Sequence, residues 1–345
     1  MTKEILKMGV SAGLLIALGG IWTGVHAQPT GLQSSTQHSS GESVTESEQH
    51  QTSQHTSSYR LIGFLQQQFI FNENNSVPHQ FSIHRVRVGI QGRVTEQVHI
   101  TLVGGFTEPP DDTPRLVNAF ADYHLHPMLS IRAGQFLVPF GLEGQEIIAL
   151  NPAIERSTVV RRINTFMMFS DVGVQVGGRL SNFEYAFALV NGAGANRAEQ
   201  IDPKDLVGRV GIRFNDRLNV GLSGHIGRYQ SDPASTQYEP RYRGGVDVAF
   251  SVSGFFFRGE YLYRQDDRPD DDAIKMHGGY GLAGYALSER LDVIARYEYM
   301  DQNTRLNRQN LSIVTLGANV RPFEKTRISA NYEFREDDLN PGMKN

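Results

Sequence analysis

Arginine is the residue type in this chain whose number and spacing suggest chemistry. Of 33 basic residues only six are lysines, and arginine stays charged in any surroundings while offering a planar fork of donors. Many arginines occupy alternate positions in stretches of β pattern, so that one face of each strand would carry them. Rings or ladders of arginine attract anions and repel cations. The set comprises Arg85, Arg87, Arg93, Arg132, Arg209, Arg213, Arg258, Arg264, Arg296, Arg327 and Arg335.

Acidic residues on the same faces offer a second explanation, an interior lattice of ion pairs that steadies a wall. These acids are Asp122, Asp247, Glu260, Asp292, Glu298 and Glu333. Charges that select a solute are expected where a passage is narrowest, because a low-dielectric constriction focuses the field. We therefore predict a constriction with Arg132 on a strand and Arg156, Arg161 and Arg162 on a loop, opposed by Glu143, Glu146 and Glu155. The other predicted pore-lining residues are Arg85, Arg87, Arg209 and Arg213.

No catalytic, cofactor or metal site is predicted, and we expect no enzymatic activity. The histidines at positions 84, 99, 124, 225 and 277 lie in different segments, without metal-ligand spacing. No serine sits in a Gly-x-Ser-x-Gly elbow. The acidic run at residues 266–272 lacks the ordered ligand spacing of a calcium-binding loop, so we expect a solvated outer loop there.

Short strands are the elements that would position the arginines. From Tyr59 onward, apolar and polar side chains alternate in about fifteen runs separated by turn signals, which is the signature of strands. Connections alternate between short ones, such as residues 180–182, and long ones, such as residues 191–205. Outer-membrane barrels have tight periplasmic turns and longer outer loops. The pattern predicts an all-β, antiparallel up-and-down transmembrane barrel over residues 59–345.

About fifteen strands is an odd number, so a chain that starts in the periplasm would end its last strand on the outer side of the membrane. Single-chain bacterial barrels have even strand counts, with both termini periplasmic. We therefore expect a barrel of about sixteen strands, of which about fifteen are visible and a closing strand after Arg335 is missing.

Residues 138–170 form the longest connection and interrupt the strand pattern. The interruption begins at Val138-Pro139-Phe140-Gly141, where proline cannot donate to a sheet ladder and glycine releases the backbone. The segment mixes apolar pairs with arginines, which favours packing over disorder. Because long connections in compact domains are usually functional or disordered, we predict that this loop folds into the barrel lumen and narrows it.

The first 58 residues differ from the rest of the chain. Lys3 and Lys7 precede an apolar stretch at residues 9–22, and Val25-His26-Ala27 follows. This order predicts a cleaved signal peptide over residues 1–27, since the apolar stretch is too short to span a bilayer. Residues 28–58 are almost entirely polar and are predicted to be a disordered periplasmic segment. The net charge of −4 gives no indication of nucleic-acid binding.

One motif resembles a known family. Residues 132–143, Arg-Ala-Gly-Gln-Phe-Leu-Val-Pro-Phe-Gly-Leu-Glu, resemble a strand end of the phosphate-selective porin O and P family, and further likeness covers residues 59–335. The resemblance implies a sixteen-stranded, trimeric outer-membrane channel that passes small anions such as phosphate and contacts outer-membrane lipids and lipopolysaccharide. The chain departs from that family in its missing closing strand and in having no lysine cluster on its loops.

A passive porin with some anion preference is therefore the leading functional hypothesis. One alternative is an outer-membrane barrel hydrolase of the phospholipase or protease type, which needs a nucleophile, a histidine and an acid on neighbouring strands. The other is a barrel with a binding or adhesion role and no channel.

Overall fold

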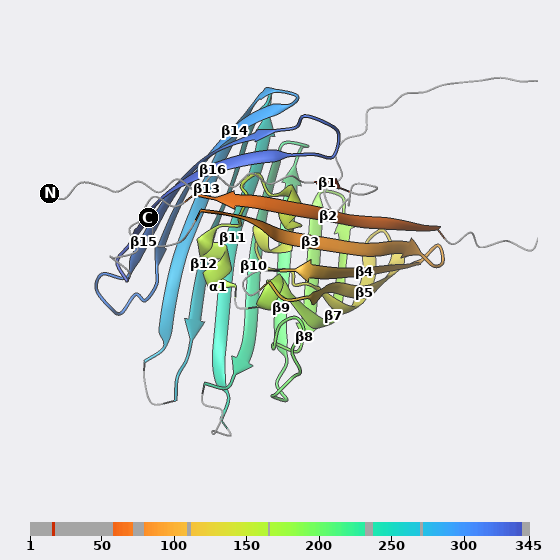
Figure 1. The fold of residues 1–345 in the computed structure, drawn as a ribbon. Helices are drawn as coiled ribbons and strands as arrows, with labels where there is room; N and C mark the ends of the chain where they lie inside the picture. The colour runs from red at the N-terminus through yellow and green to blue at the C-terminus, as the bar shows by residue number, and fades with distance from the viewer. Residues whose placement is uncertain are drawn as a thin grey trace, which may run out of the picture.

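The computed structural model describes residues 16–17, 58–71, 79–108, 112–164, 166–231, 237–269 and 272–339. It confirms the predicted all-β fold: each strand pairs antiparallel with its neighbours in the chain, in one sheet (Figure 1). The strands are β1 (Ile16–Ala17), β2 (Ser58–Ile70), β3 (Gln80–Arg93), β4 (Val98–Thr107), β5 (Arg115–His126), β6 (Leu129–Leu137), β7 (Ser170–Leu180), β8 (Phe183–Val190), β9 (Asp205–Phe214), β10 (Leu218–Tyr229), β11 (Glu239–Val252), β12 (Phe255–Asp266), β13 (Ile274–Ser288), β14 (Leu291–Asp301), β15 (Asn310–Val320) and β16 (Ile328–Asp337).

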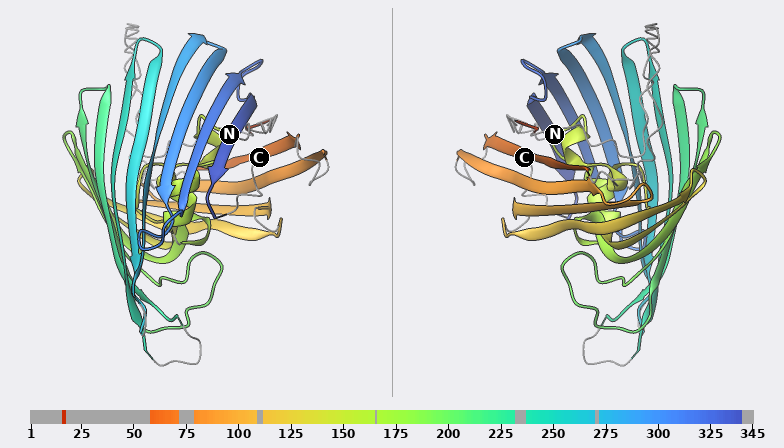
Figure 2. Two further views of the ribbon diagram at one scale, coloured as in Figure 1. Left: turned by 90° about the vertical axis from the view of Figure 1, so that its left-hand side faces the viewer. Right: turned by 90° about the vertical axis from the view of Figure 1, so that its right-hand side faces the viewer.

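The sheet curls around its own inner face, with β2 toward one edge and β16 at the other (Figure 2). Fifteen strands run from β2 to β16, the number expected from the alternation, and the two-residue β1 pairs with β2. Among the described residues no ladder joins β16 to β2. In that same part of the chain, no helix has the length and apolar character needed to cross a membrane.

Alternation decides which side chains face inward. In β14, Val293, Tyr297 and Tyr299 are exposed on the outer face, whereas Arg296 and Glu298 are buried on the inner face. Successive side chains of a strand point to opposite faces. The apolar-out, charged-in arrangement therefore follows from the period-two pattern of the sequence.

The short connections are tight turns that require left-handed backbone. Ser181, Asn215 and Ser253 have φ values of 55°, 56° and 47°, and Gly254 follows at 82°. The two-residue hairpin turns at residues 181–182 and 253–254 match the twist of the flanking strands, and the turn at residues 215–217 has three residues. These turns gather at one end of the sheet, which we call the short-turn end.

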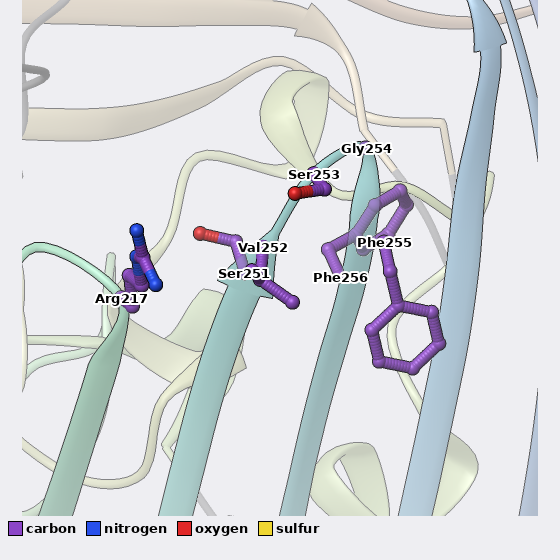
Figure 3. Close-up of a pocket in the computed structure, with 7 residues that line it drawn as sticks. All are labelled: Arg217, Ser251, Val252, Ser253, Gly254, Phe255 and Phe256. Carbon is purple, nitrogen blue, oxygen red and sulfur yellow. The ribbon is translucent and has the colours of Figure 1, made fainter.

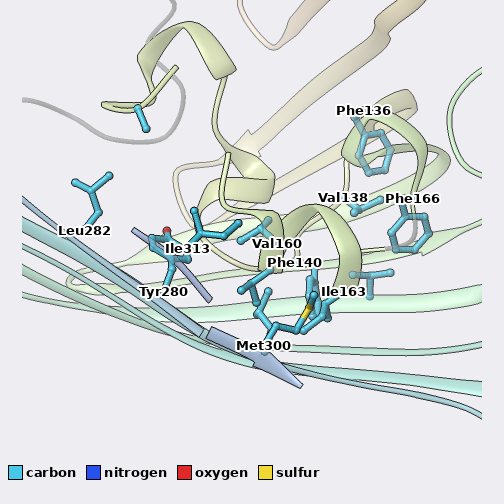
Figure 4. Close-up of a cluster of buried hydrophobic side chains, with 14 of the residues drawn as sticks. Phe136, Val138, Phe140, Val160, Ile163, Phe166, Tyr280, Leu282, Met300 and Ile313 are labelled. Atoms are coloured by element: carbon cyan, nitrogen blue, oxygen red, sulfur yellow. The ribbon is translucent and has the colours of Figure 1, made fainter. Parts of the chain in front are cut away.

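The long segment between β6 and β7 packs against the inner face of the sheet, as predicted. It contains three short 3-10 helices, η1 (Glu143–Gln145), η2 (Ile148–Leu150) and η3 (Met167–Phe169), and one α-helix, α1 (Thr158–Ile163). We call residues 138–169 the inner loop. Its apolar side chains form one buried cluster with inward residues of β12 to β15 (Figure 4). The members of this cluster labelled in Figure 4 are Phe136, Val138, Phe140, Val160, Ile163, Phe166, Tyr280, Leu282, Met300 and Ile313.

Truncating Ile163 to alanine is expected to destabilise the protein by about 2–5 kcal/mol, because a fully buried side chain would leave a cavity behind. Thermal unfolding of the refolded protein in detergent measures the effect. Leu150→Ala is the matched control, since Leu150 lies in the same loop with 54% of its surface exposed. Equal losses from both substitutions would contradict the packed inner loop.

Candidate functional site

The first half of the inner loop is attached to the wall by backbone groups. The N–H groups of Leu142 and Glu143 donate to the two carboxylate oxygens of Glu260 on β12, at 2.8 Å each. The N–H of Gly141 donates to Ser223 Oγ at 3.0 Å. Gly141 has a φ of 70°, and a Cβ there would meet Glu260 Oε2 at 2.5 Å. Glycine is therefore required where the loop turns onto the wall.

A second carboxylate holds the other half of the loop. Glu298 Oε2 on β14 accepts hydrogen bonds from Ser157 Oγ at 2.8 Å and from the N–H of Thr158 at 2.6 Å. The neighbouring Arg296 pairs with Glu298 at 2.9 Å and donates to the carbonyl of Glu155 at 2.8 Å. Glu260 and Glu298 thus fix two separate points of the loop from adjacent regions of the wall.

Arg156 makes contacts that link separate parts of the inner loop. Its Nε donates to the carbonyl of Glu143 at 2.8 Å, and its Nη2 donates to the carbonyl of Glu146. The guanidinium carbon lies 4.4 Å from the ring centre of Phe169, in cation–π geometry. Burial and repulsion by Arg87 lower the pKa of Arg156 to about 10. The side chain is therefore still a cation at neutral pH.

The pKa values of two carboxyl groups in the inner loop are shifted in opposite directions. Burial raises the pKa of Glu143, although Arg296 and Arg258 oppose the shift. Burial would also raise the pKa of Glu155, but attraction to Arg85 and hydrogen bonds from His84 and Arg85 outweigh it and hold that pKa well below its ordinary value. His84 Nε2 lies 2.5 Å and Arg85 Nη2 lies 2.9 Å from the two Glu155 oxygens.

A cavity of about 1070 Å³ lies between the inner loop and the wall formed by β2 to β5. We call it the central cavity. It continues to the short-turn end, where residues 289–290, 321 and 323–327 line it. The cationic side chains around its loop-facing part are Arg85, Arg87, Arg156, Arg161 and Arg197.

The acids of this part of the central cavity are each held by an arginine. Glu108 accepts two bonds from Arg87, at 2.5 and 2.8 Å. Glu155 pairs with Arg85, as described above, and Glu146 pairs with Arg258 at 2.6 Å.

Three arginines have no such partner. Within the described ranges, Arg156, Arg161 and Arg197 have no carboxylate oxygen within 4.0 Å. Arg161 donates to Thr158 Oγ1 at 3.0 Å instead. The cavity therefore carries an excess of positive charge at the level of the loop.

Apolar side chains form the opposite part of the lining. Ile62, Val103 and Val117 make a buried cluster, against which Met168 of the loop packs. Met168 and the following Phe169 have φ values of 55° and 59°. A left-handed conformation costs free energy for residues with a side chain and persists only where the surroundings enforce it. Here it accompanies contact of Met168 with the wall and of Phe169 with Arg156.

Six of the eleven predicted site residues line the central cavity. These are Arg85, Arg87, Glu146, Glu155, Arg156 and Arg161. The structure brings them together from β3 and from both halves of the inner loop.

The other five lie outside this lining and make contacts typical of an ion-pair lattice. Arg132 forms a bidentate pair with Asp122 at 2.7 and 3.0 Å, and Arg209 forms one with Asp247 at 3.0 and 2.6 Å. Arg213 and Arg162 lie 3.9 and 4.0 Å from Glu184 and Asp337. Glu143 is a buried residue of the inner loop itself and accepts a hydrogen bond from the N–H of Ser157 at 2.8 Å. A role in the pore for these five remains a prediction.

Sequence reasoning missed Arg197 and the apolar lining. The apolar lining had a signal, because strict alternation fails at Leu61-Ile62, Leu102-Val103 and Leu116-Val117, where two apolar residues are adjacent. One of each pair must face inward. Leu61 is 53% exposed and Ile62 only 6% exposed. Arg197 had no comparable signal, because it lies in a long connection without periodicity.

A smaller hollow of about 380 Å³ lies at the short-turn end. Figure 3 shows its lining residues, Arg217 and residues 251–256, at the turns that follow β9 and β11. It combines a single cation with two phenylalanines and serine hydroxyl groups. This hollow is separate from the central cavity in its lining, so we place the candidate site in the latter.

Acidification below pH 4.5 is expected to destabilise the protein through Glu155. Its depressed pKa contributes stability that is present above 4.5 and is lost as pH falls toward the folded-state pKa. Denaturant midpoints between pH 3 and 6 should fall with pH less steeply in Glu155→Gln than in the wild type. The raised pKa of Glu143 has the opposite effect, because it lowers the stability of the folded protein as pH rises above 4.5. Exposed Glu289→Gln is the control, and an identical slope in Glu155→Gln would contradict the assignment.

Residues 49–343 match the profile of the protein family described as "Putative beta-barrel porin-2, OmpL-like". No curated protein sequence matches this chain.

Several solved structures share the fold. In-vitro folded OmpT of Vibrio cholerae, in its trimer form, has a TM-score of 0.65 at 13% identity, covering 81% of this chain and 89% of that chain. An anion-selective porin from Comamonas acidovorans has a TM-score of 0.64 at 12% identity, covering 82% and 90%. The outer membrane channel DcaP of Acinetobacter baumannii has a TM-score of 0.58 at 12% identity, covering 82% and 99%.

These matches confirm the porin part of the predicted resemblance. The description of the matched family does not mention phosphate selectivity, so the phosphate-selective part stays a prediction. At these identities the structural likeness establishes the shared barrel fold alone.

Proposed function

The chain belongs to the putative beta-barrel porin-2, OmpL-like family, and on that premise we propose that it is a passive outer-membrane diffusion channel that prefers small anions. The observation that carries the preference is the charge balance of the central cavity. Each acid in the loop-facing part of the cavity lining is held by an arginine, whereas Arg156, Arg161 and Arg197 have no carboxylate partner within the described residues. Uncompensated cations in a narrow passage raise the local concentration of anions.

The proposed channel has a defined orientation in the outer membrane and defined partners. The short turns face the periplasm and the long connections face outward, as in other bacterial barrels. The exposed aromatic and aliphatic side chains of the outer face, such as Tyr261 and Tyr297, suit contact with outer-membrane lipids and lipopolysaccharide. A homotrimer is proposed by analogy with the trimer form of Vibrio cholerae OmpT.

Export is part of the same proposal. A signal peptide over residues 1–27 and a polar segment over residues 28–58 remain predictions, since apart from β1 and Ser58 these residues lie outside the described part of the chain.

The proposal is tested by single-channel recording in a planar bilayer under a potassium chloride gradient. Steady openings with a reversal potential displaced toward that of chloride are expected. Phosphate is then added to measure whether it competes with chloride. A cation-side reversal potential would contradict the anion preference, and lipid or peptide hydrolysis without conductance would support the barrel-hydrolase alternative instead.

A further inference from the structure

We infer that the central cavity is a binding subsite for amphipathic organic anions, which carry a carboxylate or similar group on an aromatic or branched alkyl body. This inference rests on the proposed channel function and specifies its solute class. A passage for inorganic anions needs charge and water along its walls. The central cavity has charged side chains on one part of its lining and a cluster of apolar side chains on another.

The apolar part is built from residues that face away from lipid. Ile62 and Phe64 of β2, Val103 of β4 and Val117 of β5 are all buried on the inner side of the sheet. With Met168 of the inner loop they line the cavity from both sides. Barrel interiors are ordinarily polar, so an apolar strip here requires an explanation other than packing against lipid.

The charged part adjoins this strip directly. The guanidinium carbon of Arg87 lies 5.6 Å from the ring centre of Phe64, and that of Arg156 lies 4.4 Å from the ring centre of Phe169. Each of these arginines thus links the cationic lining to an aromatic ring. A ligand whose anionic group approaches Arg156 or Arg161 would place its apolar body over the strip.

The volume of the central cavity fits an amphipathic organic anion. Sites for small organic molecules have volumes of about 300–1,000 Å³ and are mostly apolar, with a few polar groups that fix orientation. The central cavity, at about 1070 Å³, matches that size and that distribution of groups. Inorganic phosphate would occupy a small part of it and leave the apolar strip in contact with water.

Blockade of the potassium chloride current tests the inference. Phenylacetate, acetate and neutral benzyl alcohol are titrated against the wild-type channel. Phenylacetate is expected to halve the current at a concentration at least tenfold lower than acetate or benzyl alcohol does. The variant Ile62→Thr, Val103→Thr, Val117→Thr is expected to reduce the advantage over acetate to less than about twofold, with block measured relative to that variant's own unblocked chloride current. The conservative variant Ile62→Val, Val103→Ile, Val117→Ile is expected to keep the wild-type advantage.

Each contrary outcome is distinct. Anion-selective channels with equal sensitivity to phenylacetate and acetate would overturn the inference and leave the proposed function standing. Equal block by benzyl alcohol and phenylacetate would show an apolar site without anion recognition. A threonine variant with wild-type block would exclude the strip as the binding surface. Absence of channels in the wild type would overturn the proposed function and this inference with it.

Discussion

Replacing Glu260 and Glu298 together by alanine is expected to raise the single-channel conductance at least about twofold. The two carboxylates accept hydrogen bonds from both halves of the inner loop, in addition to the bonds that Ser223 and Arg296 make to it. Each lost bond to a charged group costs about 1.5–3 kcal/mol. The change also leaves Arg296 buried without the carboxylate of Glu298, which costs about 3–5 kcal/mol. The loop should then leave its inner position and widen the passage.

Conductance in a planar bilayer and cleavage of the inner loop by trypsin measure this release. Arg156, Arg161 and Arg162 become accessible to the protease only when the loop moves out, because local opening governs cleavage.

The matched control removes two carboxylates that hold Arg209 within the wall, Glu184→Ala with Asp247→Ala. This control is expected to lower stability without raising conductance. Unchanged conductance and protection in the Glu260→Ala, Glu298→Ala variant would show that apolar packing alone holds the loop.

Reversing the charge of Arg161 and Arg197 is expected to lower the anion-to-cation permeability ratio about tenfold. Both side chains are exposed to the central cavity, so glutamate is tolerated at each position. Two unit charges about 4 Å apart interact by about 1 kcal/mol even in water, and about 1.4 kcal/mol corresponds to a factor of ten. The reversal potential under a salt gradient reports the change directly.

The control for charge reversal is Lys204→Glu with Arg217→Glu, which alters net charge equally at exposed positions outside the central cavity. Its reversal potential is expected to match that of the wild type. The effect of the Arg161 and Arg197 changes should also shrink as salt is raised from 0.1 to 1 M, because screening shortens the reach of exposed charges. Equal shifts in both variants would place selectivity in the overall surface charge instead.

Much of the barrel could be predicted because strand alternation is a local property. The side chains of residues i and i+2 point the same way whatever surrounds them, so Arg296 and Glu298 could be assigned to the inner face and Tyr297 to the outer face. Turn length likewise depends on a few neighbouring residues. The inner loop was recognisable from Pro139 and Gly141, which end the ladder in any context.

The site could be predicted only in part, because it depends on which residues meet across the lumen. Nothing local distinguishes Arg156, which lies over Phe169 in the cavity lining, from Arg162, six positions on, which lies near Asp337. Both are loop arginines, and the attachments at Glu260 and Glu298 decide which way each one faces. Those carboxylates lie more than 100 residues further along the chain.

The order of strands, their inner and outer faces and the presence of a packed inner loop were thus encoded in short stretches of sequence. Which arginines remain without a carboxylate, and that an apolar strip faces them, depended on contacts between segments distant in the chain. The physical reason is the distance along the chain over which each feature is determined. The backbone geometry of a strand repeats every two residues. The pairing of charges, and the packing of Met168 on Ile62, Val103 and Val117, exist only once the sheet has curled around the loop.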